Sequence, residues 1–70
     1  MNKLSLRGDH ITLAQALKVA GLVDTGGQAK LLVRAGVVTV NNVVTTQPGR
    51  KLAPGDRFRV QDGEEWTVSR

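Results

Sequence analysis

The chain has 70 residues, the size of one small domain. It contains no cysteine and no cluster of His, Asp and Glu with metal-ligand spacing. We therefore expect neither disulfides nor a metal to stabilise the fold. Ten Lys and Arg residues against six Asp and Glu residues give a formal net charge of +4, which favours a polyanionic partner. The only aromatic residues are Phe58 and Trp66, so a surface of several rings that stack on bases is not expected.

The beginning of the chain, MNKLSLRG, lacks the apolar run of a signal peptide. No later stretch is long and apolar enough to cross a bilayer. We therefore expect a soluble, cytoplasmic protein without a membrane partner, and the absence of cysteine is consistent with a reducing compartment.

The first elements predicted in chain order are a short strand and a helix. Leu4 and Leu6 alternate with polar neighbours, as in a strand. Thr12 followed by Gln15 is a capping-box pattern that marks a helix start, and Gly21 is typical of a helix end. The apolar face of this helix is expected to comprise Leu13, Ala16, Leu17 and Ala20.

A second helix is predicted from Thr25 to Gly36. Thr25 is followed three residues later by Gln28, which repeats the capping pattern, and Gly26 and Gly27 then occupy the first two helical positions. Its expected buried face comprises Ala29, Leu32 and Val33. Lys30 and Arg34 are four residues apart and therefore share another face.

From Val37 onward the apolar period changes to two, which predicts a β-rich half. Val38 and Val40 lie on one face of a strand, Asn41-Asn42 suits a type I′ turn, and residues 43–46 return as the next strand. Residues 46–51 form a loop that ends in Arg50 and Lys51. Pro54-Gly55 is typical of a type II turn, and strands are expected at 57–60 and 65–68.

The last hairpin allows two registers. A two-residue Asp62-Gly63 loop would pair Arg59 with Trp66 and so mix polar and apolar faces. A three-residue loop, 62–64, would instead pair Val60 with Trp66 and Phe58 with Val68. Because burial determines register, we predict the second. The predicted core then holds Leu17, Leu32, Val38, Val40 and Phe58, together with Trp66, whose alternative role is an exposed ring that stacks on a base.

The two glycines at the second helix start, in the stretch DTGGQAK, require an explanation, because glycine is about 1 kcal/mol worse than alanine in a helix. One hypothesis is an open anion site, since a helix start offers unpaired backbone N–H groups to phosphate and Gly26-Gly27 add no side chain that obstructs it. Lys30 and Arg34 would then meet neighbouring phosphates. The alternative is structural: a sharp turn or a close backbone contact, beside a solvated basic face.

The run VDTGGQAKLLVRAGVVTVNN followed by RKLAPGD resembles the RNA-binding domain named after small-subunit ribosomal protein S-four, also called the alpha-L motif. The shared pattern includes the small residue at the second helix start, Ala29, Gly36, Val38, Val40, Asn41 and Gly55-Asp56, and it covers about residues 11–60. The chain closely resembles the stand-alone bacterial versions of the domain. The chain departs from many members at Thr12-Leu13-Ala14, where they have Arg-Leu-Asp, and at Thr25-Gly26, where they have Ser-Arg.

The resemblance implies an α+β fold in which two N-terminal helices pack on a small, bent antiparallel sheet, with RNA bound by the second helix and nearby hairpin loops. Carried over by position, the implied RNA-binding residues are Gly26, Gly27, Gln28, Lys30, Arg34, Arg50 and Lys51. Whether Lys3, Arg7, Arg57 and Arg59 join this surface stays open.

We find no arrangement of residues typical of catalysis. His10, the one histidine, has no paired nucleophile and is expected in a surface loop. Gly26-Gly27 lacks the spacing of a nucleotide-hydrolysing loop. These observations predict no enzyme activity, cofactor, metal or small-molecule substrate. The resemblance implies a ribosome-associated RNA-binding protein, which we expect to recognise structured ribosomal or transfer RNA by phosphate and shape. The alternatives are a DNA-binding helix-turn-helix protein and an adapter that binds a protein partner.

Overall fold

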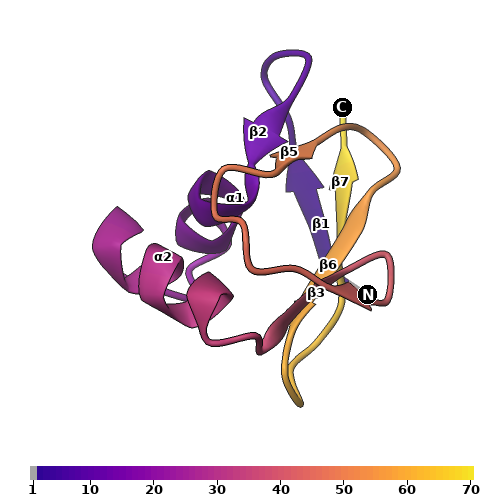
Figure 1. Ribbon diagram of the computed structural model, residues 1–70. Coiled ribbons are helices and arrows are strands. Elements are labelled where there is room, and N and C mark those ends of the chain that lie inside the picture. Colours follow the sequence, from indigo (N-terminus) through magenta and orange to yellow (C-terminus); the bar gives the residue numbers. More distant parts are fainter. Residues whose placement is uncertain (1) are drawn as a thin grey trace.

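The computed structural model describes residues 2–70, and it has the predicted α+β class, with two helices lying beside a sheet (Figure 1). The elements in chain order are β1 (Asn2–Ser5), β2 (Ile11–Thr12), α1 (Leu13–Val19), α2 (Gly26–Arg34), β3 (Val38–Val40), β4 (Val43–Val44), β5 (Lys51–Leu52), β6 (Arg57–Val60) and β7 (Trp66–Ser69).

Helix α1 begins and ends at the residues that its sequence signals indicate. The Thr12 side chain accepts from the Gln15 N–H while the Gln15 side chain accepts from the Thr12 N–H, which completes the capping box. At the other end Gly21 has φ +78, and the Gly21 and Leu22 N–H groups donate to the carbonyls of Lys18 and Leu17. These two hydrogen bonds form a Schellman motif, in which carbonyls of the last helical turn receive hydrogen-bond donors.

The strands form a five-stranded sheet in the order β1-β7-β6-β3-β4 and a separate two-stranded sheet, β2-β5. The pairs β3-β4, β3-β6 and β6-β7 are antiparallel, as expected, but β1 pairs with β7 in parallel. The sheet is therefore mixed, because the first strand joins the last strand of the chain rather than a neighbour in sequence. Strand β4 is shorter than the predicted 43–46, although the Thr45 N–H still donates to the Val38 carbonyl.

Two predicted turns are confirmed by their backbone angles. Asn41 and Asn42 have φ values of 51° and 68°, the positive pair that a type I′ turn requires. Gly55 has φ +98, and the Asp56 N–H donates to the Ala53 carbonyl across Pro54-Gly55. This arrangement is that of a type II turn.

The predicted register of the last hairpin is wrong by two residues. Phe58 pairs with Trp66 and Arg57 with Thr67, whereas we expected Val60 opposite Trp66. The turn closes earlier than predicted, since the Gly63 N–H donates to the Val60 carbonyl and Asp62 has φ +61.

Contacts distant in sequence explain this register. Strand β7 is also paired with β1, and the Val68 backbone exchanges hydrogen bonds with Gly55 and Asp56. A shift of two residues leaves each side chain on its expected face, so the polarity argument could not detect it.

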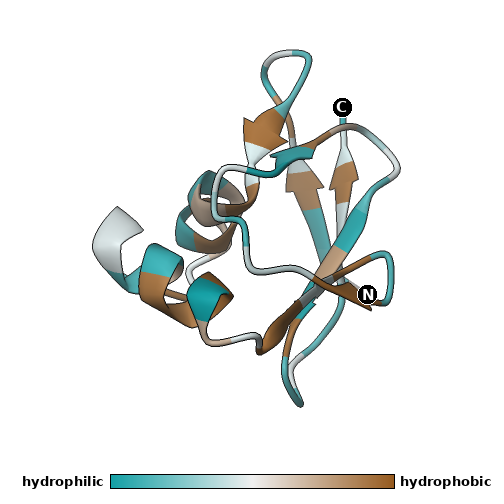
Figure 2. Ribbon diagram, in the orientation of Figure 1, coloured by the Kyte–Doolittle hydropathy of each residue, from teal (hydrophilic) through white to brown (hydrophobic). Residues whose placement is uncertain are grey.

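The core lies between the helices and the sheet. The buried apolar residues are Leu4, Leu13, Ala16, Leu17, Ala29, Val33, Val38, Val40, Leu52, Phe58 and Val68. Of the predicted core, Leu17, Val38, Val40 and Phe58 are buried, whereas Leu32 and Trp66 are half-buried and pack against its edge. The Trp66 ring stacks on Phe58, with centroids 6.4 Å apart. Figure 2 shows the same division, with apolar residues in the helices and strands and hydrophilic loops at both ends of the sheet.

Candidate nucleic-acid interface

The start of α2 is formed by local hydrogen bonds. The Thr25 side chain accepts from the Gln28 N–H at 3.1 Å, so Thr25 is the N-cap as predicted. The Gln28 side chain reaches one residue further back than in a full capping box, and its Oε1 accepts from the Asp24 N–H at 2.8 Å. Gln28, a predicted RNA-binding residue, therefore also stabilises the connection between the two helices.

Gly26 and Gly27 are not required by the conformation of the chain. Neither has a positive φ, unlike Gly21, Gly36 and Gly55. A Cβ at Gly26 would meet nothing within 4 Å, and a Cβ at Gly27 would meet only the Thr25 hydroxyl at 3.8 Å, an ordinary contact. Neither a positive φ nor a close contact at the missing Cβ therefore explains these two glycines within residues 2–70.

The same two residues leave backbone donors unpaired. The first N–H groups of a helix have no partner within the helix. The Gln28 N–H is bound by Thr25, but the N–H groups of Gly26 and Gly27 have no acceptor among residues 2–70. The helix start therefore presents two unpaired donors that no side chain of their own residue covers.

Lys30 and Arg34 follow on the same helix, and both are exposed. Neither forms an ion pair or a side-chain hydrogen bond within the described part of the chain, where Arg57 and Glu65 make a 3.8 Å ion pair. Arg34 stands in the last turn of α2, where a positive charge also suits the helix dipole. Both charges are available to an external anion.

Arg50 and Lys51 are exposed too, but their backbone is attached to α1 and not to α2. The Leu13 N–H donates to the Arg50 carbonyl at 2.8 Å, and the Ala14 N–H donates to the Pro48 carbonyl at 3.1 Å. Lys51 pairs with Thr12 in the β2-β5 sheet. This segment satisfies the open N–H groups at the α1 start, so the predicted site residues are divided between the starts of the two helices.

A hydrogen-bond network around Asp56 joins two turns of the β-half. Its carboxylate accepts from the Ala53 N–H at 2.8 Å and from the Asn41 Nδ2 at 3.2 Å, while the Asn41 Oδ1 accepts from the Arg57 N–H. The Ala53 hydrogen bond holds the pKa of Asp56 below its ordinary value; partial burial opposes this shift, and the Asn41 amide and the Arg50 charge support it. Asn41 therefore anchors the β3-β4 turn, a role that its turn propensity alone does not reveal.

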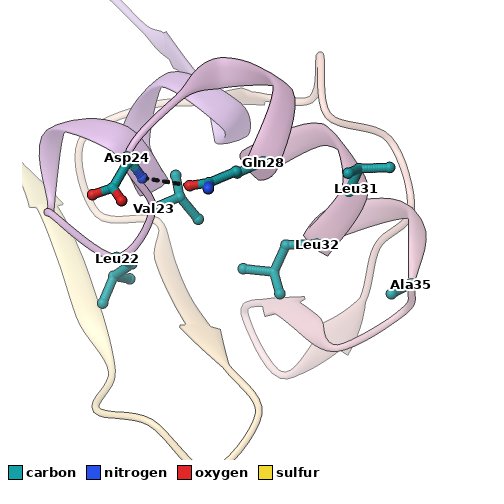
Figure 3. A pocket seen from close by; sticks show the side chains of 7 residues that line it. All are labelled: Leu22, Val23, Asp24, Gln28, Leu31, Leu32 and Ala35. Carbon is teal, nitrogen blue, oxygen red and sulfur yellow. Dashed lines mark hydrogen bonds between the residues drawn. The ribbon is translucent and has the colours of Figure 1, made fainter.

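Sequence reasoning missed an apolar groove beside α2, which we call the α2 groove. Leu22 and Asp24 lie toward one end of it and Leu31 and Ala35 toward the other (Figure 3). Val23, Gln28 and Leu32 line the part between them. Leu31 is 71% exposed. The signal was present in the sequence, because adjacent residues of a helix diverge by about 100° and only Leu32 could turn toward the core.

Other classes of site have little support in residues 2–70. No group of three His, Asp or Glu side chains there could hold a metal ion. His10 is exposed in the loop between β1 and β2, where it was expected. Neither helix has the length and apolar character needed to cross a membrane.

Comparison with known proteins identifies a family and a curated relative. A family model described as the S4 domain matches residues 4–69. The chain is also similar to a protein of Bacillus subtilis (strain 168) named "Probable ribosome maturation protein RlbA", with 37% identity over 60 residues. The aligned region covers 86% of this chain and 84% of that protein, so the similarity extends well beyond the helical pair.

Proposed function

The chain belongs to the S4 domain family, and we propose that it is a small RNA-binding protein that recognises structured RNA of the ribosomal or transfer RNA class. The Bacillus subtilis relative is named for ribosome maturation, which supports a ribosome-related role for this chain as well. We place it in the cytoplasm, as a binding protein and not an enzyme.

The main support for this proposal is the start of α2. Gly26 and Gly27 add no side chain there, their N–H groups are unpaired within residues 2–70, and neither glycine serves packing or an unusual backbone angle. Such a helix end attracts a phosphate through its N–H groups and its dipole. The proposed first contact is one RNA phosphate at this point.

Further phosphates would be bound by the basic side chains. Lys30 and Arg34 continue along α2, and Arg50 and Lys51 stand near the start of α1, which packs against α2. Phosphates spaced along a folded RNA would meet both groups, and their arrangement in space would select shape rather than sequence.

The test compares a structured RNA with duplex DNA of equal charge at matched salt. We expect tighter binding to the RNA and an affinity that falls as salt rises, because binding releases counterions. Equal affinity for RNA and DNA would favour the DNA-binding alternative. Failure to bind either, with a cellular partner retained at high salt, would favour the protein adapter.

A further inference from the structure

The face of the five-stranded sheet that points away from the helices carries basic and hydroxyl side chains. Both helices lie on one side of this sheet (Figure 1). Because side chains alternate along a strand, the residues that stand between the buried ones on β1, β3, β6 and β7 point to the other side. We call this surface the outer sheet face, and it is formed by Lys3, Ser5, Thr39, Arg57, Arg59 and Thr67.

Strand pairing brings three cations together on the outer sheet face. Lys3 and Arg57 are both paired with Thr67, so they stand on either side of it, about 10 Å apart across three strands. Arg59 follows Arg57 at about 7 Å along β6 and is paired with Thr39. All three cationic side chains are exposed. They form one cluster that exists only because β1 joins the sheet beside β7.

Most of this positive charge has no partner within the protein. Glu65, which precedes β7, forms the 3.8 Å ion pair with Arg57 and offsets one of the three charges. Lys3 and Arg59 form no ion pair within residues 2–70. Since neighbouring like charges repel one another, a polyanion bound across the cluster is favoured.

The composition of the outer sheet face is that of a surface for a phosphate chain. The centre of a protein interface is apolar and rich in aromatic side chains, and proteins that lie on membranes insert apolar side chains. The outer sheet face has threonines beside its cations, and the exposed apolar Val44 stands only at its edge, on β4. Arg, Lys and Thr are among the side chains that contact the phosphates and sugars of nucleic acids.

The outer sheet face is separate from the proposed phosphate contacts at α2. Helix α2 contributes Ala29 and Val33 to the core, which covers the opposite face of the sheet. The sheet and the core therefore lie between the two surfaces, in a molecule whose Cα atoms extend 18 Å along the shortest axis. An RNA helix that lies against α2 leaves the outer sheet face free for another one.

From these observations we propose that the outer sheet face binds the phosphate backbone of a second RNA segment, so that one chain bridges two segments. Lys3, Arg57 and Arg59 contact the second segment while the start of α2 holds the first. This inference rests on the proposed RNA-binding function and adds to it a means of bringing two parts of a folded RNA together.

The test uses the full chain and one short structured RNA hairpin prepared in two forms, one with a donor and one with an acceptor fluorophore. A chain that binds both forms brings the fluorophores together. Energy transfer should therefore rise until there is one chain for every two hairpins and fall again when the chain is in excess. Sedimentation velocity should give one chain and two hairpins in the bridged complex.

Matched substitutions separate the two surfaces. Arg59→Gln should reduce the energy transfer, and the double variant Lys3→Gln/Arg59→Gln should abolish it while one hairpin still binds. Each lost phosphate contact should lower the salt slope of the second binding step by about 0.7–0.9. Lys18→Gln removes one charge from an exposed position in the last turn of α1 and should leave the energy transfer unchanged. Thermal midpoints confirm that every variant is folded.

The failures are distinguishable. If the unaltered chain binds one hairpin without energy transfer, or if Lys3→Gln/Arg59→Gln transfers as well as the unaltered chain, the inference is overturned and the RNA-binding function stands. An equal loss in Lys18→Gln and Arg59→Gln would show an effect of net charge alone, and a bridged complex with two chains would show dimerisation. Either result also overturns the inference. Failure to bind any hairpin would overturn the proposed function as well.

Discussion

At the α2 start, Gly26 and Gly27 occupy helical positions that alanine could fill without any clash. By contrast, Gly36 has φ +78, an angle that costs a residue with a Cβ roughly 1–2 kcal/mol. Two neighbouring parts of one helix thus use glycine for different reasons. The glycine after the helix is required by the fold, whereas the glycines that begin it lower the helix propensity with no gain in packing.

Substitution of these glycines should therefore have opposite effects on stability. Gly27→Ala should raise the free energy of unfolding by about 0.5–1 kcal/mol, and Gly36→Ala should lower it by roughly 1 kcal/mol or more. Gly27→Glu should also be tolerated by the fold, because a carboxylate suits a helix start, yet it should weaken RNA binding where it displaces a phosphate. Urea unfolding and anisotropy measure the two quantities. A Gly27→Glu protein that binds at full strength would assign the glycines no role in RNA binding.

Lys30 provides a residue-level test of the charge contribution. The side chain is exposed and has no ionic partner within residues 2–70, so Lys30→Ala should barely change the thermal midpoint. If Lys30 binds one phosphate, the slope of log affinity against log salt should fall by about 0.7–0.9. Lys18→Ala removes the same charge from an exposed position in the last turn of α1, outside the proposed contacts, and is the matched control. Equal slopes in the two variants would contradict a specific contact at Lys30.

At the scale of elements, the predictions that succeeded rest on local signals. Thr12 and Gln15 predicted the α1 start, Gly21 its end, and Asn41-Asn42 the tight turn, because each signal acts within about four residues. The register of β6 and β7 was wrong because it depends on β1 and on residues 55–56, which are distant in sequence from the turn.

The candidate site likewise combines features that local patterns predict with contacts between segments distant in sequence. Gly26 and Gly27 at the helix start and the exposed Lys30 could be predicted from the helix pattern, and they remain untested as RNA contacts. The attachment of Arg50 to the α1 start, and the Asn41–Asp56 hydrogen bond, join segments that no local pattern connects.

The Asp56 carboxylate, which joins two turns, should make the thermal stability of the protein depend on pH. The pKa of Asp56 is lowered in the folded chain, so its contribution is present above its ordinary value near 3.8 and is lost as pH falls through the folded pKa. Between about pH 5 and pH 2 the thermal midpoint of the unaltered chain should fall more than that of Asp56→Asn, which cannot be protonated there. At neutral pH Asp56→Asn should be the less stable protein. Parallel midpoint curves for the two proteins would exclude this role.

At the scale of the whole molecule, the first and last strands complete the sheet. The residues that most resemble the family pattern are about 11–60, yet the family model matches 4–69. The structure explains the difference, because β7 pairs with the edge of β6 and β1 pairs with the other edge of β7. Leu4 and Val68 are buried in the core, and the Trp66 ring stacks on Phe58.

A fragment of residues 11–60 should therefore fail to fold, although it contains both helices and every RNA-binding residue predicted from the sequence. Without β1 and β7, the edge of β6 loses its hydrogen-bond partners and Phe58, now 1% exposed, loses Trp66 and Val68 from its surroundings. So short a chain already buries only about 60% of its unfolded surface, and the loss removes apolar burial that it cannot replace. Circular dichroism should show a cooperative thermal transition for residues 1–70 and none for the fragment. A cooperative transition in the fragment, with dispersed NMR signals for Val38 and Phe58, would instead show that the helices with β3 and β6 form an independent core.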